Sequence, residues 1–207
     1  MRYDGSIISW ELMEMETADP KLIDFPDAFE SSRLLIRAPR FGDGAAVNEA
    51  VLESLDELKP WMPWAQTAPS VEQSELNVRS AIAAFIMRTD LRLMLTDKQT
   101  GRMIGGSGLH RMNWDVRSFE IGYWVRSSEA GKGYVTEAVQ AITAFASERL
   151  AANRIEIRCD SINERSAAVA VRCGFTLEGV LRQDSRDSTG QLRDTKVFSK
   201  VRGAEFV

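Results

Sequence analysis

The stretch "EIGYWVRSSEAGKGYVTEAV", Glu120 to Val139, joins a strand pattern to a helix pattern through a lysine flanked by glycines. Its first residues alternate between two faces, as in a strand, and Val135 and Val139 begin a helical spacing. A loop at this place exposes unpaired main-chain N–H groups at the positive end of the helix dipole. Because Gly131 and Gly133 have no side chains, a phosphate can approach those groups closely. The stretch therefore predicts an anion site, with a simple tight turn as the alternative.

Two familiar phosphate-binding loops do not match this stretch. A Walker A loop needs a serine or threonine after its lysine, and here Gly133 follows Lys132. A Rossmann fingerprint needs a third glycine where Thr136 stands, and it needs an early βαβ unit that the sequence does not show. The pyrophosphate of some other cofactor remains as the interpretation.

The patterns on either side of this stretch predict an α+β fold with a sheet of mixed direction. Strands are expected over 32–39, twice within 91–112, and over 118–125, 154–160, 175–182 and 195–201. Helices are expected over 43–60 with Asp43 as N-cap, from Ser70 with a capping box to Gln73, after the glycine loop, and over 163–174. Residues 1–30 are expected to form an N-terminal extension and residues 31–207 the single domain.

Composition and charge narrow the class of protein. A formal net charge of −4 over 207 residues argues against a general nucleic-acid binder. No apolar run is long enough to cross a bilayer, and the acidic amino terminus is a poor signal peptide, so a cytoplasmic protein is expected. Cys159 and Cys173 are expected to be reduced, and no metal site is expected. His110 is the only histidine, and a structural role is expected for it.

The combined motifs resemble the GNAT acyltransferases. The similarity is carried by "GYWVRSSEAGKGYVTEAV" and, some thirty residues later, by "RIEIRCDSINERSAAVAVRCGFTLEGVLR". It extends from "SSRLLIRAP" through "WMPWAQTAPS" and "IGGSGLHRMNW" to "LRDTKVFSKVRG", which is nearly everything after residue 30. Within this family the sequence is similar to the RimJ/RimL type, which acetylates the amino termini of ribosomal proteins. The resemblance implies the GNAT fold, in which a mostly antiparallel sheet is splayed at its centre and has helices on both faces.

The resemblance also implies acetyl-coenzyme A (acetyl-CoA) as cofactor. Its pyrophosphate is expected on the amides of Gly131, Lys132, Gly133 and Tyr134. Its pantetheine arm is expected to pair with the splayed strand, along the backbone of Gly122, Tyr123, Trp124, Val125 and Arg126. An amide near Trp124 or Val125 would face the thioester oxygen. Ser128 and Ala130 depart from the usual family loop, but the main contacts are backbone N–H groups, so binding is still expected.

The resemblance assigns the catalytic groups less completely. Many relatives protonate the leaving thiolate with a tyrosine on the helix that starts at Asn163, and this helix has none. Ser166 is expected to donate to the sulfur instead. Asn163 is expected to hold the pantetheine, although both residues also suit the first turn of a helix.

Two carboxylates remain as candidates for the general base. Glu120 lies on the Gly122 and Trp124 side of the splayed strand, and Asp184 lies near the place of the RimL-type carboxylate, where Ser185 is the alternative match. Trp61 and Trp64 are expected to line the acceptor site or, alternatively, to cover the core.

The resulting hypothesis is an N-acetyltransferase that transfers acetyl from acetyl-CoA to a primary amine in a ternary complex. The acceptor would be a protein amino terminus, such as that of a ribosomal protein, or a small-molecule amine. The alternatives are an inactive CoA-binding sensor or scaffold and, less favoured by the motifs, an ATP- or NAD-binding protein. No nucleic-acid or membrane partner is expected, and the sequence leaves monomer and homodimer open.

Overall fold

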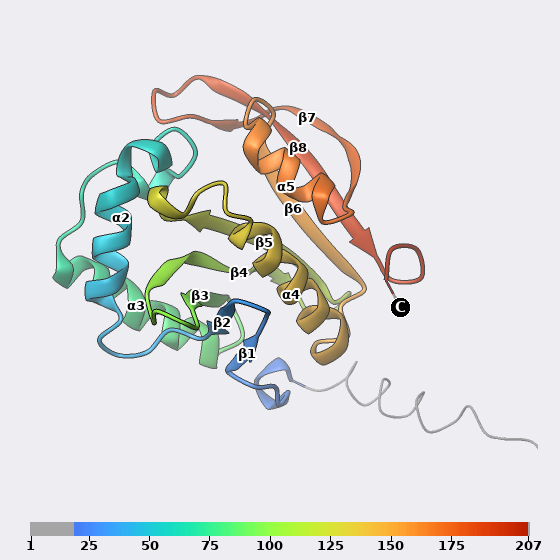
Figure 1. Ribbon diagram of the computed structural model, residues 1–207. Helices are drawn as coiled ribbons and strands as arrows, with labels where there is room; N and C mark the ends of the chain where they lie inside the picture. Colours follow the sequence, from blue (N-terminus) through green and yellow to red (C-terminus); the bar gives the residue numbers. More distant parts are fainter. Residues whose placement is uncertain (1–18, 207) are drawn as a thin grey trace, which may run out of the picture.

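The computed structural model describes residues 19–206, which form one eight-stranded sheet in the order β1-β2-β3-β4-β5-β6-β8-β7 (Figure 1). The strands are β1 Ala28–Glu30, β2 Leu34–Arg37, β3 Leu91–Asp97, β4 Met103–Asn113, β5 Ser118–Val125, β6 Arg154–Asp160, β7 Thr176–Arg186 and β8 Leu192–Val201. The helices are α2 Gly44–Leu58, α3 Val71–Ile86, α4 Tyr134–Arg149 and α5 Glu164–Arg172, with short 3-10 turns at Pro20–Leu22, Pro63–Ala65 and Ser127–Glu129. The predicted α+β fold with a mostly antiparallel sheet and helices on both faces is confirmed.

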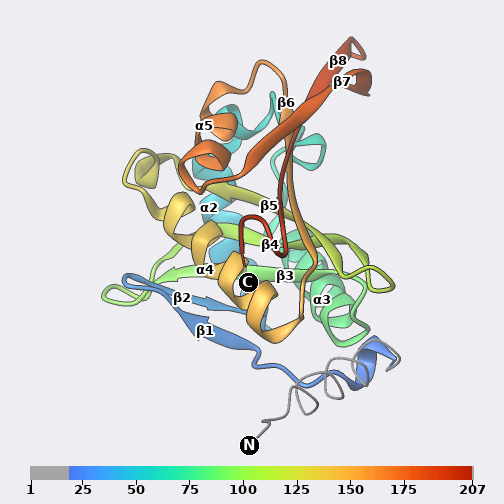
Figure 2. The same ribbon diagram turned by 90° about the vertical axis from the view of Figure 1, so that its right-hand side faces the viewer.

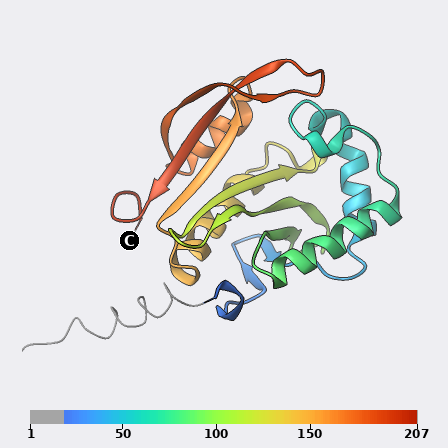
Figure 3. The same cartoon turned by 180° about the vertical axis from the view of Figure 1, so that it is seen from behind.

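The core lies where α4 packs on the sheet. Val139 and Ile142 of α4 are fully buried, as is Phe119 of β5. The alternation along β5 places Phe119 on the α4 side of the sheet and Trp124 on the opposite side. There Trp124 packs against a second apolar cluster that includes Ala50 of α2. Figure 1 shows α4 and α5 on the near side of the sheet, and Figure 3, seen from behind, brings α3 to the front.

The sheet opens between β5 and β6. These strands are parallel and pair only over 118–120, where Glu120 lies opposite Glu156. The rest of β5 continues to pair with β4 as far as Val125 but has no strand partner on its β6 side within residues 19–206. Figures 1 and 2 show β6, β7 and β8 diverging from the other strands. The predicted splay is confirmed, and it leaves one edge of β5 open at the centre of the molecule.

Part of the predicted N-terminal extension packs against the domain. The strand β1 pairs antiparallel with β2, and Phe29 stacks on Phe145 of α4 with ring centroids 4.5 Å apart. Phe25 packs edge-on against both Phe85 and Phe145. Residues 1–18 lie outside the described part of the chain.

The helix starts show one confirmed cap and one correction. Ser70 and Gln73 form the predicted capping box at the start of α3. Asp43 precedes α2 as predicted, but its side chain does not cap the helix. Its carboxylate instead binds both terminal nitrogens of Arg37, at 2.7 and 2.8 Å, and accepts from the Arg40 N–H. A charge-assisted pair competes successfully with the cap for the same oxygens.

Candidate active site

The loop between β5 and α4 presents a run of main-chain donors. No described residue accepts a hydrogen bond from the N–H groups of 131–136. Gly131 and Gly133 have φ of +77° and +85°. Apart from its two chain neighbours, no described residue has a heavy atom within 4 Å of the place that a Cβ on Gly131 would take. The glycines are therefore required by the left-handed backbone and not by crowding. Free N–H groups at the start of a sixteen-residue helix form a suitable cradle for phosphate groups.

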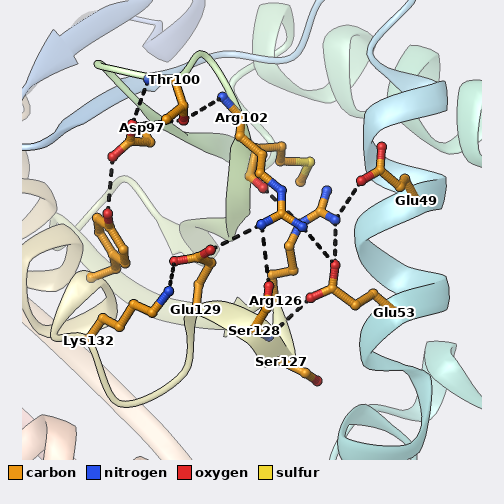
Figure 4. A network of polar contacts seen from close by, with 12 residues as sticks. Glu49, Glu53, Asp97, Thr100, Arg102, Arg126, Ser127, Ser128, Glu129 and Lys132 are labelled. Carbon is orange, nitrogen blue, oxygen red and sulfur yellow. Dashed lines mark hydrogen bonds and ion pairs between the residues drawn. The ribbon is translucent and has the colours of Figure 1, made fainter.

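A polar network fixes the segment that leads into this loop (Figure 4). Arg126 is 1% exposed, and its guanidinium binds Glu49 at 2.8 Å and Glu53 at 2.7 Å on α2. Glu53 also accepts from the Ser128 N–H, and Arg102 bridges Glu53 to Glu129. Burial favours a raised pKa for Glu53, but the hydrogen bonds from Ser128 and Arg126 outweigh it and lower the pKa to about 2. The carboxylate is therefore ionised at neutral pH and ties the loop to α2.

Two aromatic and cationic groups fix the other end of the loop. Arg33 donates to the Lys132 carbonyl at 3.0 Å, and its guanidinium lies 4.2 Å from the centre of the Tyr134 ring. The Tyr134 hydroxyl donates to Asp97, the last residue of β3. The Lys132 ammonium pairs with Glu129 and is half exposed. Arg33 is a site residue that the sequence pattern did not indicate, because it precedes a short strand far from the loop in sequence.

The open edge of β5 supplies a second set of donors. The Arg126 N–H donates to the Ile104 carbonyl of β4. Since N–H groups alternate between the two edges of an antiparallel strand, Trp124 and Gly122 also face β4, while Tyr123 and Val125 face the opening. The geometry thus places the Val125 amide, and not that of Trp124, toward the predicted cofactor arm. The Arg126 side chain points to α2, away from the open edge of β5.

The first turn of α5 lies next to the open edge. Asn163 caps the helix by accepting from the Ser166 N–H at 3.0 Å. The Tyr123 hydroxyl lies 2.9 Å from Ser166 Oγ and 3.0 Å from the Ser166 carbonyl. Burial raises the pKa of Tyr123, so the phenol keeps its proton at neutral pH. The helix has no tyrosine of its own, but β5 brings one to the predicted proton donor.

A cavity of about 690 Å³ lies on the α2 and α3 side of the sheet. Its lining includes Trp64, Trp124 and Gly122. The rings of Trp64 and Trp124 meet edge-on with centroids 6.0 Å apart, and Trp64 is 53% exposed at this wall. Trp61 is not part of the lining. An aromatic wall beside an open strand edge suits an acceptor site.

Neither of the predicted base candidates, Glu120 and Asp184, is part of the cavity lining. Burial raises the pKa of Glu120, although Arg111 and Arg158 oppose the effect. Glu120 Oε2 is buried without a hydrogen bond, and Arg111 Nε lies 3.4 Å away. Asp184, on β7, accepts from Arg158 of β6 at 2.8 Å. Asp184 is thus held in an ion pair, whereas Glu120 is only weakly paired.

Other kinds of site find no support in the described residues. Within 19–206, no group of histidine, cysteine, aspartate or glutamate side chains could hold a metal ion. In the same part of the chain, no helix is long and apolar enough to cross a membrane. Cys159 and Cys173 are both buried and unpaired.

Comparison with known proteins identifies the fold and the relatives. Residues 33–176 match the family described as "Acetyltransferase (GNAT) domain". The ribosomal-protein-serine acetyltransferase of Escherichia coli K12 is 30% identical over 128 residues, which cover 60% of this chain and 71% of the relative. A structure of RimL, the ribosomal L7/L12 alpha-N-protein acetyltransferase, in complex with coenzyme A has a TM-score of 0.77 at 25% identity and covers 83% of this chain and 95% of that chain. The microcin C7 self immunity acetyltransferase, in complex with acetyl-CoA and AMP, has a TM-score of 0.78 at 24% identity and covers 86% of this chain and 97% of that one, which shows the shared fold.

Proposed function

The chain belongs to the GNAT acetyltransferase family and is an acetyl-CoA-dependent N-acetyltransferase, and we propose that its acceptor is the free amino terminus of a peptide or protein. The Escherichia coli relative, named for its action on a ribosomal protein, supports an acceptor of this class. A ribosomal protein is the leading candidate. A small-molecule amine is the alternative, because the residues that line an acceptor site do not transfer between relatives by analogy.

The observation that carries this proposal is the juxtaposition of the open edge of β5 with the cavity. On one side, the free N–H groups of 131–136 would hold the cofactor pyrophosphate, with Arg33 fixing the loop through the Lys132 carbonyl. On the other side, the wall formed by Trp64 and Trp124 would receive an extended chain end. A strand exposed between the two sites suits a direct transfer within a ternary complex.

Different residues of this chain would carry out different steps of acetyl transfer. Bound acetyl-CoA supplies an acetyl thioester. The amide of Val125, which faces the opening, would donate to the thioester oxygen and stabilise negative charge there. Ser166 would donate a proton toward the sulfur, and the phenol of Tyr123 would hold the Ser166 hydroxyl in position. Asn163 would fix the turn that carries Ser166 and would contact the pantetheine.

An amino-terminal acceptor also matches the modest strength of the available bases. The α-amine of a peptide has a pKa of roughly 8, so part of it is already neutral at pH 7, whereas a lysine amine near 10.4 is almost fully charged. The site therefore needs a group that accepts a proton as the new bond forms, but it does not need a strong base.

Thiol release from acetyl-CoA tests the proposal. The wild-type protein is incubated with peptides that begin with serine, with the same peptides blocked at the amino terminus, and with small primary amines. The proposal predicts thiol release with the free peptides and addition of one acetyl group at their amino termini by mass spectrometry. Thiol release only with small amines would exclude a peptide acceptor. If none of the amines tested supports thiol release, the proposed function is refuted.

A further inference from the structure

The single histidine of the chain lies in the wall of the acceptor cavity. His110, on β4, contributes to the lining together with Gly122 and Trp124, whereas neither Glu120 nor Asp184 does so. Its side chain is 29% exposed. Of these three titratable groups, His110 is therefore the one that borders the cavity in which an acceptor would bind.

The position of the ring depends on a pair of facing glycines. Gly108 of β4 and Gly122 of β5 are direct cross-strand partners. A Cβ on Gly122 would lie 2.9 Å from His110 Cδ2 and 3.2 Å from Nε2, and a Cβ on Gly108 would lie 3.0 Å from Cε1. Side chains at these positions would displace the ring, so the glycines let it lie over β5. The Nε2 edge is thereby brought beside the strand whose far edge is open.

The other ring nitrogen is held by a carboxylate. His110 Nδ1 lies 2.7 Å from Oδ2 of Asp90, the residue before β3. Because a carboxylate at neutral pH only accepts, Nδ1 carries the proton in the neutral ring and Nε2 presents its lone pair. No described residue forms a hydrogen bond with Nε2. The ring is therefore oriented and has the correct tautomer to accept a proton from the cavity.

The neighbouring charges favour a transient imidazolium. Asp90 lies on one side of His110, and Glu120 is its direct partner on β5 on the other side. Arg111 on β4 is turned toward Glu120, and Arg92 of β3, which also lines the cavity, bonds to Asn77 of α3. Each cation is thus directed to another partner, whereas the carboxylates flank the ring.

We propose that the His110–Asp90 pair is the general base of acetyl transfer. The inference rests on the proposed function and adds the group that accepts the proton. As the amine nitrogen forms the new N–C bond and the C–S bond breaks, the proton lost by nitrogen goes to His110 Nε2. Asp90 keeps the ring in place and stabilises its charge, and the imidazolium then returns the proton to solvent. The sulfur receives its own proton from the Ser166 side.

Nuclear magnetic resonance tests the ring without turnover. Because His110 is the only histidine, ¹⁵N-labelled histidine in protein purified without a polyhistidine tag gives one set of ring signals. The inference predicts that the neutral form of the ring carries its proton at Nδ1, in the free protein and with CoA bound. In Asp90→Asn, the preference for this tautomer should be lost, because the carboxylate that accepts from Nδ1 is gone. A ring protonated at Nε2, or a tautomer unchanged in Asp90→Asn, would overturn it.

Kinetics then connect that titration with catalysis. The pH profile of kcat/KM is measured by thiol release, with acetyl-CoA and a peptide that begins with serine, or with the best amine of the panel. For the wild type, kcat/KM should fall on the acid side with the midpoint seen for the ring. In His110→Gln we expect a loss of about 10²-fold to 10⁴-fold and no limb at that midpoint. In Asp90→Asn the limb should move with the ring signal, and in the matched control Asp115→Asn, an exposed carboxylate of the β4–β5 turn, nothing should change.

The outcomes separate this inference from the function itself. If folded His110→Gln keeps wild-type kcat/KM and its acid limb, His110 is not the base, although the protein remains an acetyltransferase. If Glu120→Gln instead removes the limb, the base is Glu120. If the wild type binds CoA but acetylates no amine, the proposed function fails and this inference fails with it. Thermal melts of each variant distinguish lost chemistry from lost folding.

Discussion

Replacing Glu53 by glutamine should loosen the support of the cofactor loop and destabilise the fold. Glu53 accepts from Arg126, which is 1% exposed, and from the Ser128 N–H. The lowering of its pKa from 4.5 to about 2 corresponds to ~3 kcal/mol at 1.36 kcal/mol per pKa unit. Because the side chain is 28% exposed and glutamine keeps an acceptor oxygen, we expect a loss of ~2 kcal/mol in the free energy of unfolding.

The pH dependence of this loss follows from the direction of the shift. A carboxyl group whose pKa is lowered by folding stabilises the protein above its ordinary pKa, and this contribution is lost as pH falls through the folded value. The difference between wild type and Glu53→Gln should therefore be complete at pH 7.5 and fall to less than half at pH 3. Urea unfolding at both pH values measures it.

A matched control lies one helical turn away. Glu49 binds the same guanidinium, but its side chain is 69% exposed, so Glu49→Gln should cost less than ~1 kcal/mol. Equal losses for the two variants would contradict the assignment of the buried contact to Glu53. A Glu53→Gln protein as stable as the wild type at pH 7.5, or a loss that does not shrink in acid, would contradict a stabilising role of the ionised Glu53 carboxylate.

Further predictions concern the loop, the proton donor and the buried carboxylate. Gly133→Ala should cost ~1–2 kcal/mol and weaken CoA binding in calorimetry, because φ is +85° there; unchanged affinity would contradict it. Tyr123→Phe removes the hydroxyl beside Ser166 Oγ and should lower kcat by about tenfold with little change in the Kd of CoA; a change in Kd alone would oppose this role. Burial raises the pKa of Glu120, so stability from this group is present below its ordinary pKa and is lost as pH rises through the folded pKa. Glu120→Gln should therefore raise Tm at pH 7.5 but not at pH 4, and a lower Tm at pH 7.5 would contradict it.

The sequence predicts those features of the site that depend on local pattern. Alternation identified β5, and the glycines on either side of Lys132 identified the loop. Each of these two signals is contained in a few consecutive residues, so it can be read without knowing the fold. The capping box at Ser70 is a signal of the same kind. The three-residue strand β1 is too short for alternation to show.

Contacts between distant segments could not be read in the same way. Arg33 donates to the carbonyl of Lys132, which lies 99 residues later in the sequence. The residues around Arg33 predict only the start of a strand. The Asp90–His110 pair depends on the register of β3 with β4, which no local pattern sets. For the same reason, the sequence alone predicts a structural role for His110. The structure places its side chain in the cavity wall.

The free main-chain N–H groups at the start of α4 are expected to bind the cofactor pyrophosphate. An amide ¹H–¹⁵N titration of the ¹⁵N-labelled protein with CoA tests this role. The signals of Gly131, Lys132, Gly133 and Tyr134 should move downfield together as these groups acquire an acceptor. If CoA binds while these signals stay in place, the pyrophosphate lies elsewhere and the β5–α4 loop is not the cofactor site.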